Sequence, residues 1–226
     1  MDDAVCPHGI AMATTTPFSD ARPAGAWDVV VRLGDTDGSA VHPHLRRLLG
    51  PGPPQRCLSD AVHALCDVHG RHPGMIDDAL LHGVQPGSLL WLEAAAIGFA
   101  VERRYLAELT AAVGPLPSTP GQAMAETALA GVRHALSILA ESQRAGCASG
   151  AVAALLQDWP AIRLVLDIAA LRFGVTVPAA ALPALDGGVA APGTDRAIGF
   201  GAQQLFAQHR GLWSLLEARA GARGDI

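Results

Sequence analysis

The sequence predicts an all-α protein, an up-down bundle of four long helices preceded by short helices and an irregular segment rich in proline and glycine. Three observations lead to this fold class. Hydrophobic residues make up 50% of the 226-residue chain, which is enough to bury a substantial core. From Ser59 onward, residues that cap and stop helices recur at regular intervals. Between these signals, apolar residues repeat at helical spacing.

Residues 1–57 are expected to form an irregular N-terminal arm, because they contain proline-rich runs such as "GPGPP". The stretch "WDVVVRL", residues 27–33, is rich enough in valine to form one short strand or a docked extended segment. His42 and His44 are interpreted as part of a solvated loop rather than as a ligand pair. The helical bundle domain is expected to span residues 58–226.

Two short helices should open this domain. Ser59 can cap a helix that runs to His69 and stops at Gly70, and "PGMIDDALLHG" can form a second helix with Pro73 at its start. His69 projects on the same side as Val62 and Leu65, so it should face the core. The motif "HGRHPGMID" is therefore first of all a helix-helix junction.

Capping signals place the four long helices at residues 88–113, 119–145, 149–174 and 195–220. Helices of roughly 25 residues would each be about 37 Å long. Short loops join the first three, which should therefore lie antiparallel to their neighbours. The third is expected to break or bend near Pro160. A linker rich in proline, glycine and alanine, residues 175–193, precedes the fourth.

Composition excludes several classes of protein. The net charge of -5, the absence of lysine and the thinly spread arginines argue against binding to nucleic acid or to an anionic membrane. The four cysteines form no C-x-x-C pair, which argues against a zinc knuckle or a redox motif. The N-terminus lacks the positive start of a signal peptide, and charged residues interrupt the apolar windows. A cytoplasmic protein is expected.

Two polar residues fall inside apolar helical stripes and are the most informative anomalies. Glu102 lies in the stripe of helix 88–113, and His209 lies near the centre of the stripe of helix 195–220. A buried carboxylate needs a partner, and His209 is the predicted one. Such a pair could position a general acid or base, share a metal, or simply lock the register of the bundle. Tyr105 could join the same network.

Weaker candidates lie on the other two long helices. Arg163 and Asp167 stand at i, i+4 spacing and are expected to form an ion pair. His134 and Glu141 lie on the margin of an apolar stripe. The first hypothesis for function is a small-ligand-binding bundle with no cofactor and no metal. Its predicted binding pocket is formed by Glu102, His209, His69, Arg163 and Tyr105.

Two alternatives remain open. The first is an atypical ferritin-like metal-dependent oxidoreductase, although the Glu-x-x-His signature of that class is absent. It would need the unusual ligand set Glu102, His134, Glu141 and His209. The second is a non-catalytic homodimeric interaction or assembly protein. The residues expected at its dimer face are Leu212, Trp213, Leu215 and Leu216.

The stretches "HGRHPGMID", "GPLPSTPGQA" and "LLQDWPAIR" together resemble an uncharacterised family of bacterial all-helical proteins. The resemblance covers roughly residues 59–220. It implies a single helical domain in a bacterial cytosolic setting. Because the family has no assigned activity, the resemblance transfers no catalytic residue.

Overall fold

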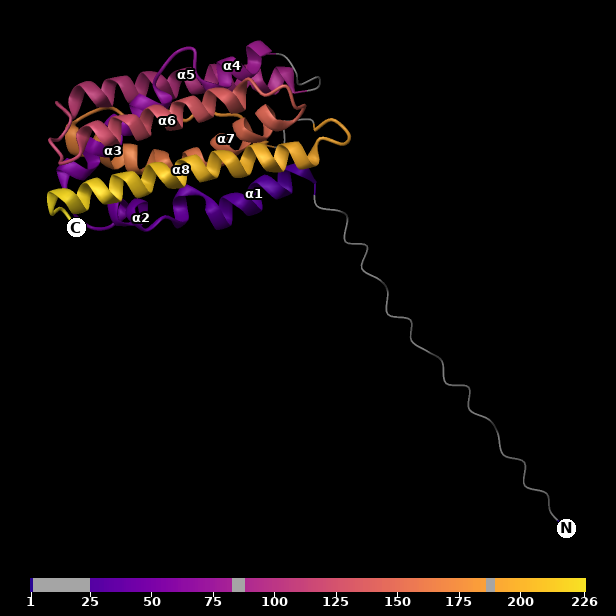
Figure 1. Ribbon diagram of the computed structural model, residues 1–226, viewed down its shortest axis with the longest axis horizontal. Coiled ribbons are helices and arrows are strands. Elements are labelled where there is room, and N and C mark those ends of the chain that lie inside the picture. The colour runs from indigo at the N-terminus through magenta and orange to yellow at the C-terminus, as the bar shows by residue number, and fades with distance from the viewer. Residues whose placement is uncertain (2–24, 83–87, 186–189) are drawn as a thin grey trace.

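The computed structural model describes residues 1, 25–82, 88–185 and 190–226, and the regular elements within these ranges are all helical. The all-α prediction is confirmed. The short elements come first: α1 (Ala26–Asp37), the 3-10 turn η1 (Ser39–Val41), α2 (Pro43–Leu49), α3 (Gln55–His69) and α4 (Met75–His82). The long helices follow: α5 (Leu89–Ala112), α6 (Gln122–Ala140), α7 (Cys147–Phe173) and α8 (Asp195–Arg223), as Figure 1 shows.

Most predicted ends of the long helices are confirmed to within a few residues. Ser88 precedes α5, Thr194 precedes α8, and Gly174 closes α7 with a φ of 73°. The start of α6 was placed too early, because Gly121 rather than Thr119 occupies its N-cap. The expected break near Pro160 is wrong, since α7 continues through this residue.

The N-terminal region differs most from expectation. Residues 27–33 belong to α1 and not to a strand, and α1 packs against α7 and α8 with Val30 fully buried. Tertiary packing has overridden the weak strand preference of valine. His42 and His44 are also buried rather than solvated, because Pro43 is the first residue of α2 and Nδ1 of His42 accepts a hydrogen bond from the His44 amide.

The last two helices run parallel, which departs from a simple up-down order. Asp158 of α7 contacts His209 of α8, and the start of α7 meets the start of α8 at Gly150. There the backbones touch: a Cβ added to Gly150 would lie 2.1 Å from the carbonyl oxygen of Ile198. The linker permits this arrangement, because about 20 extended residues span over 60 Å. That is enough to return along the roughly 40 Å of α7.

The described first part of the linker, residues 175–185, returns along α5. The carbonyl oxygen of Pro178 accepts a hydrogen bond from Arg163, and Ala181 lies so close to α5 that a Cβ on Gly98 would meet its carbonyl oxygen at 2.4 Å. Further on, the indole of Trp91 donates to the carbonyl oxygen of Ala184 at 3.0 Å. This part of the linker therefore covers the interface between α5 and α7.

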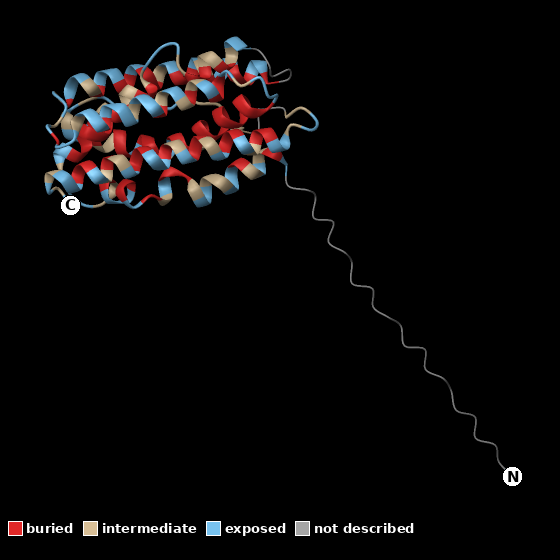
Figure 2. Ribbon diagram, viewed as in Figure 1, coloured by how far each residue is buried: buried red, intermediate tan, exposed pale blue. Residues whose placement is uncertain are grey.

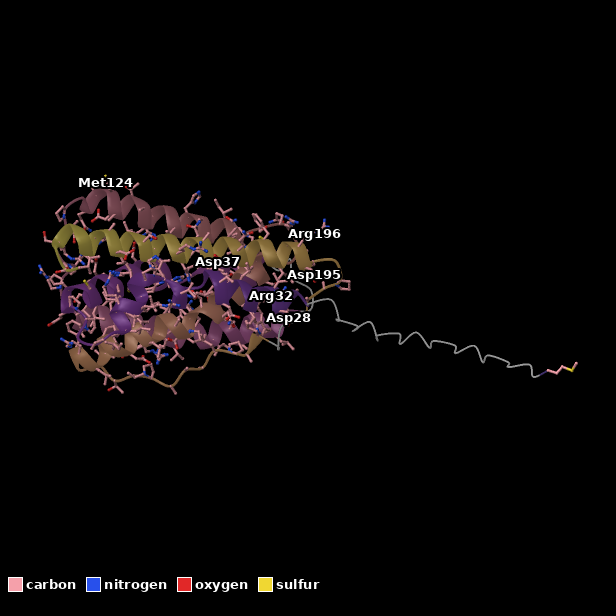
Figure 3. The ribbon with its side chains drawn as sticks, turned by 90° about the horizontal axis from the view of Figure 1, so that it is seen from below. Asp28, Arg32, Asp37, Met124, Asp195 and Arg196 are labelled. Atoms are coloured by element: carbon pink, nitrogen blue, oxygen red, sulfur yellow. The ribbon has the colours of Figure 1, made fainter. Side chains whose placement is uncertain are left out.

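Helix α6 runs opposite to α8. Met124, near the start of α6, lies at the other end of the bundle from Asp195 and Arg196, which begin α8 (Figure 3). In agreement, Gln122 at the start of α6 contacts Arg219 near the end of α8. Helices α5 and α7 run parallel to each other, because Glu102 contacts Arg163 and Tyr105 contacts Asp167.

Helix α7 lies in the middle of the bundle. Eighteen of its 27 residues are buried, and Figure 2 shows buried positions gathered toward the middle of the bundle. Trp159 of α7 and Trp213 of α8 are the largest fully buried side chains. In the described ranges, no helix combines the length and the apolar run that crossing a bilayer requires.

Candidate ligand site and two buried polar networks

The first buried network, called the Glu102 network, joins α5 to α7. Its members are Glu102, Tyr105, Trp159, Arg163 and Asp167. Glu102 is 0% exposed and accepts hydrogen bonds at both carboxylate oxygens, from the indole Nε1 of Trp159 at 3.0 Å and from Nη1 of Arg163 at 2.5 Å. Both oxygens of this buried carboxylate are therefore satisfied.

Arg163 is the centre of the Glu102 network. Its Nε donates to Asp167 at 2.9 Å, its Nη2 donates to the carbonyl oxygen of Pro178 at 2.5 Å, and its guanidinium carbon lies 4.6 Å from the centre of the Tyr105 ring. The predicted Arg163–Asp167 ion pair is confirmed. This single cation pairs with two carboxylates and links α5, α7 and the linker.

Tyr105, which is buried, completes the Glu102 network through Asp167. Its hydroxyl donates to Oδ1 of Asp167 at 2.8 Å. Burial and this hydrogen bond to a carboxylate raise the pKa of the Tyr105 hydroxyl above its usual value. The phenol therefore stays protonated and acts as a donor.

A cavity of about 410 Å³ lies beside the Glu102 network, between α5, α7 and the linker. We call it the linker cavity. Its polar lining comes from Glu102, Gln157 and Arg163. The remainder is apolar: Leu156, Trp159, Pro160, Ala180, Leu182, Pro183, Ala184 and Leu185. Linker residues 180–185 thus supply about half of the wall.

The second buried network, called the His209 network, joins α7 to η1, α3 and α8. Nδ1 of His209 lies 2.6 Å from Oδ2 of Asp158, and Nε2 of His209 lies 3.1 Å from Nε2 of His69. The amide of Ser39 donates to Oδ1 of Asp158 at 2.6 Å, and the Ser39 hydroxyl donates to Oδ2. Trp213 in turn donates to the Ser39 hydroxyl at 2.7 Å.

The His209 network is closed to solvent. His209 is 0% exposed, and none of its partners exceeds 5%. Burial, reinforced by the neighbouring His209, holds the pKa of His69 well below its usual value, so the His69 ring is neutral. An Asp–His–His chain can relay a proton in principle. Asp158 lines a hollow of about 240 Å³ between α1, η1, α2 and α7, but neither imidazole lines it.

The predicted direct contact between Glu102 and His209 is wrong. Each residue has other partners: Arg163 and Trp159 hold Glu102, while Asp158 and His69 hold His209. Helical projection identified both side chains as inward-facing, but it cannot rank partners on different helices. Arginine is the better partner for a buried carboxylate, because it is always charged and can donate several hydrogen bonds.

The predicted pocket residues therefore divide between the two networks. Glu102, Arg163 and Tyr105 come together on one side of α7, and His69 and His209 come together on another. Only the first group borders the linker cavity, through Glu102 and Arg163.

The ligand set of the oxidoreductase alternative is not brought together. His134 and Glu141 are exposed on and just after α6, whereas Glu102 and His209 are buried in separate networks. Across the described ranges, no three side chains of His, Cys, Asp or Glu are arranged to hold a metal ion.

The predicted dimer face is also wrong in its residues. Leu212, Trp213 and Leu216 are at most 1% exposed and pack within the single chain. Leu215 is partly exposed. The long apolar stripe of α8 is covered by α7, by α3 and by the N-terminal helices. The N-terminal helices contribute because α1 and α2 pack against α8, whereas an irregular arm was expected there.

Two members of the His209 network were missed from the sequence. Asp158 did carry a signal, because it interrupts the apolar run "AALLQDWPAI" of α7. Ser39 carried none, since its role depends on η1, a turn inside a region expected to be irregular. Gly38 allows this approach, as a Cβ there would lie 2.9 Å from Oδ1 of Asp158.

Residues 34–224 match a protein family described as a family of unknown function (DUF6975). The match runs from within α1 to the end of α8, so it includes both buried networks. Comparisons with curated proteins and with solved structures found no match.

Proposed function

We propose that this chain, which belongs to that family of unknown function, binds a small and mostly apolar ligand in the linker cavity. The observation that carries the proposal is the cavity of about 410 Å³ beside a buried, fully hydrogen-bonded charge cluster. Ligand sites in proteins commonly combine an apolar wall with a few fixed polar groups.

The lining indicates the chemistry of the ligand. Leucine, proline, alanine and tryptophan side chains would contact an apolar body. Glu102 and Arg163 form an ion pair, and each of their charged oxygens and nitrogens already has a hydrogen-bond partner, so they leave little attraction for a charged ligand. Gln157, which is partly exposed, can offer one donor and one acceptor. An uncharged molecule with a single polar group fits best.

The same geometry favours binding over acid–base catalysis. A general base needs a free lone pair within reach of the substrate. Glu102 already accepts two hydrogen bonds and pairs with a cation, and the Tyr105 hydroxyl donates a hydrogen bond to Asp167. These groups shape and stiffen the wall of the cavity.

The test is a titration with 1-octanol, followed by tryptophan fluorescence and by the melting temperature. Octanol should produce a saturable change in fluorescence, because Trp159 lines the cavity and Trp91 donates a hydrogen bond to Ala184 in its wall. Ala184→Trp should fill the cavity and weaken binding at least tenfold. Ala179→Trp, at an exposed linker position outside the lining, is the matched control. Equal binding by both variants, or none by the parent protein, would overturn the proposal.

Homodimeric assembly is the second candidate, on a different face from the one first expected. Leu90 and Ile97 of α5 are 79% and 73% exposed, and their seven-residue spacing places them on one side of the helix. Mass measurement by light scattering tests this candidate. A dimer that dissociates in Ile97→Asp but not in Arg196→Asp, at an exposed position on α8, would support it, and a monomeric parent protein would exclude it.

A further inference from the structure

A second hollow, which we call the α3/α6/α8 cleft, lies away from both buried networks. Its volume is about 290 Å³. Three helices present one face each to it, at helical spacing along α3 and α6. Its lining residues are Asp60, His63, Ala64 and Asp67 of α3, Leu116, Gln122, Glu126, Leu129 and Arg133 of or before α6, and Leu215, Leu216 and Arg219 of α8.

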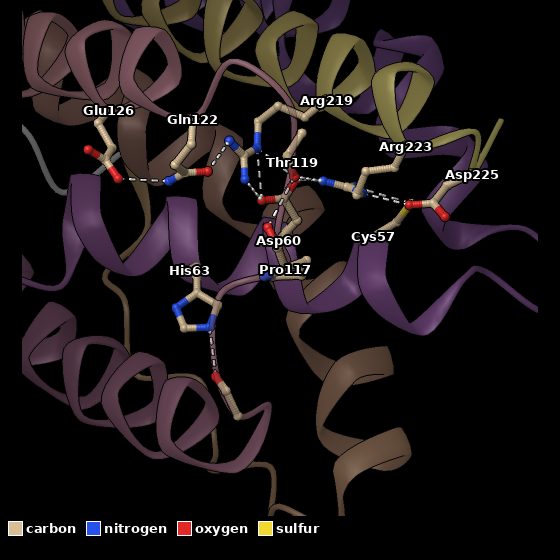
Figure 4. A network of polar contacts seen from close by, with 11 residues as sticks. Cys57, Asp60, His63, Pro117, Thr119, Gln122, Glu126, Arg219, Arg223 and Asp225 are labelled. Carbon is tan, nitrogen blue, oxygen red and sulfur yellow. Dashed lines mark hydrogen bonds and ion pairs between the residues drawn. The ribbon is translucent and has the colours of Figure 1, made fainter.

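Each arginine of the cleft is committed to a carboxylate of α3. Nε of Arg219 donates to both oxygens of Asp60, at 3.0 and 2.9 Å, and Nη1 of Arg133 pairs with Oδ2 of Asp67 (Asp60 and Arg219 are in Figure 4). Asp60 and Arg219 are 2% and 7% exposed. These two ion pairs balance the charges of the four residues, and Arg71, whose side chain is 64% exposed, also reaches Asp67 at 3.5 Å from outside the cleft.

Arg223 stands behind Asp60 and does not change this balance. It donates to Asp60 at 2.7 Å, but its Nε also pairs with Asp225 at 2.6 Å (Figure 4). The positive charge of Arg223 is therefore matched by the carboxylate of Asp225. Arg56 reaches Asp225 from outside and is largely exposed to solvent. The charges at the back of the cleft are therefore compensated or screened.

Glu126 is the exception. Among the charged residues that line the cleft, and within the described part of the chain, it is the one without an ion pair. It is exposed, and its Oε1 accepts a hydrogen bond from Nε2 of Gln122 at 2.9 Å. Gln122 is itself fixed by Arg219, which donates to its Oε1 at 2.9 Å. The carboxylate of Glu126 is thus held at the cleft with its charge unmatched (Figure 4).

The other groups of the cleft complete a recognisable pattern. Leu116, Leu129 and Leu215 add apolar wall beside the carboxylate. Nε2 of His63 donates to the carbonyl oxygen of Gly114 at 2.8 Å, so Nδ1 of the neutral ring is a hydrogen-bond acceptor. An unmatched anion, an acceptor and an apolar wall together suit a ligand that has a cationic donor at one end and a hydrocarbon body.

We propose that the α3/α6/α8 cleft binds a small organic amine in its protonated form. The ammonium group pairs with Glu126, and the apolar body packs against the leucines. This site is separate from the linker cavity, which suits an uncharged ligand, so each proposal can fail without the other.

The experiment compares three probes of equal length and different charge: hexylamine, 1-hexanol and hexanoate. Binding is followed by NMR of labelled leucine methyl groups, at pH 7 and low salt. Hexylamine should bind most tightly and should shift the methyl signals of Leu129 and Leu215. Stronger binding of hexanoate would overturn the proposal. Equal binding of all three probes would also overturn it, because it would show that only the apolar wall contributes.

Substitutions at Glu126 sharpen the test. Because Glu126 is exposed, Glu126→Gln should leave the fold intact and weaken hexylamine binding about tenfold, the usual size of one charge-assisted contact. Glu126→Arg should reverse the preference toward hexanoate. Glu108→Gln, at an exposed position on α5 outside the cleft, is the control and should change nothing. Unchanged hexylamine affinity in Glu126→Gln would reject the proposal.

Discussion

The Glu102 network and the His209 network both use α7, yet they differ in charge and in access. The Glu102 network contains a permanent cation, and it borders a cavity whose outer wall is the linker. The His209 network is built from one carboxylate, two imidazoles and a hydroxyl, and helices and η1 enclose it. Burial alone therefore does not identify a functional site, because both networks are buried.

The wall beside each network explains the difference. Linker residues 180–185 supply about half of the lining of the cavity beside the Glu102 network. The His209 network is bordered by helices and η1, where Asp158 lines a smaller hollow of about 240 Å³. We therefore expect the Glu102 network to shape the linker cavity, and the His209 network to act mainly by stabilising the fold. We expect the following changes to separate these two roles.

The largest effect should come from removing the cation of the Glu102 network. Arg163→Met leaves Glu102 buried without a charged partner, and the free energy of unfolding should fall by about 3–5 kcal/mol. Denaturant unfolding measures this loss. The double variant with Glu102→Gln should recover part of it, because no buried charge remains. A loss below about 1 kcal/mol would mean that the pair is solvated.

Removing the carboxylate of the His209 network should cost somewhat less. Asp158→Ala leaves the Ser39 amide and Nδ1 of His209 without their acceptor, and each unsatisfied buried donor costs about 1–3 kcal/mol. A loss of about 2–4 kcal/mol is expected in denaturant unfolding. Octanol binding should persist in this variant, since Asp158 does not line the linker cavity. Loss of binding with an intact fold would show that the networks are coupled.

The free energy of unfolding should depend on pH through two buried histidines, His44 and His69. Burial lowers the pKa of His44 to about 4 and that of His69 well below its usual value of 6.5. The unfolded chain binds these protons more readily, so the free energy of unfolding should fall as the pH drops below 6.5. The slope is at most about 1.4 kcal/mol per pH unit for each histidine. Above pH 7 these two histidines should no longer make the free energy of unfolding depend on pH.

A substitution isolates the contribution of His44. Its Nδ1 is buried without a hydrogen-bond partner in the described ranges, so His44→Leu should flatten the pH dependence between pH 6.5 and 4 and should not destabilise the fold near pH 7. His134→Leu, at an exposed position, is the control. Thermal melts across this pH range provide the measurement, and identical curves for parent and His44→Leu would contradict the expectation.

The two networks also differ in how far the sequence predicts them. Glu102, Tyr105 and Arg163 lie on long helices whose ends are strongly signalled, so their inward direction follows from helical geometry. The Arg163–Asp167 pair follows from i, i+4 spacing on one helix. Such local rules need no knowledge of how the helices are arranged.

The His209 network depends on that arrangement. Asp158 meets His209 because α8 runs parallel to α7, and this direction depends on the path of the linker. Ser39 joins because residues 26–49 form packed helices, although their valines and prolines resemble a strand and a loop. Long-range packing determines both the direction of α8 and the helices of residues 26–49. The periodicity of a single segment cannot predict such packing.

The most direct test of the difference between the networks is an NMR spectrum of the tryptophan indole N–H groups during a 1-octanol titration. Trp159 belongs to the Glu102 network and lines the linker cavity, whereas Trp213 belongs to the His209 network. The Trp159 signal should shift in a saturable manner, with Trp91 following through its bond to Ala184, while the Trp213 signal stays in place. A saturable shift of Trp213 with Trp159 unchanged would contradict the account.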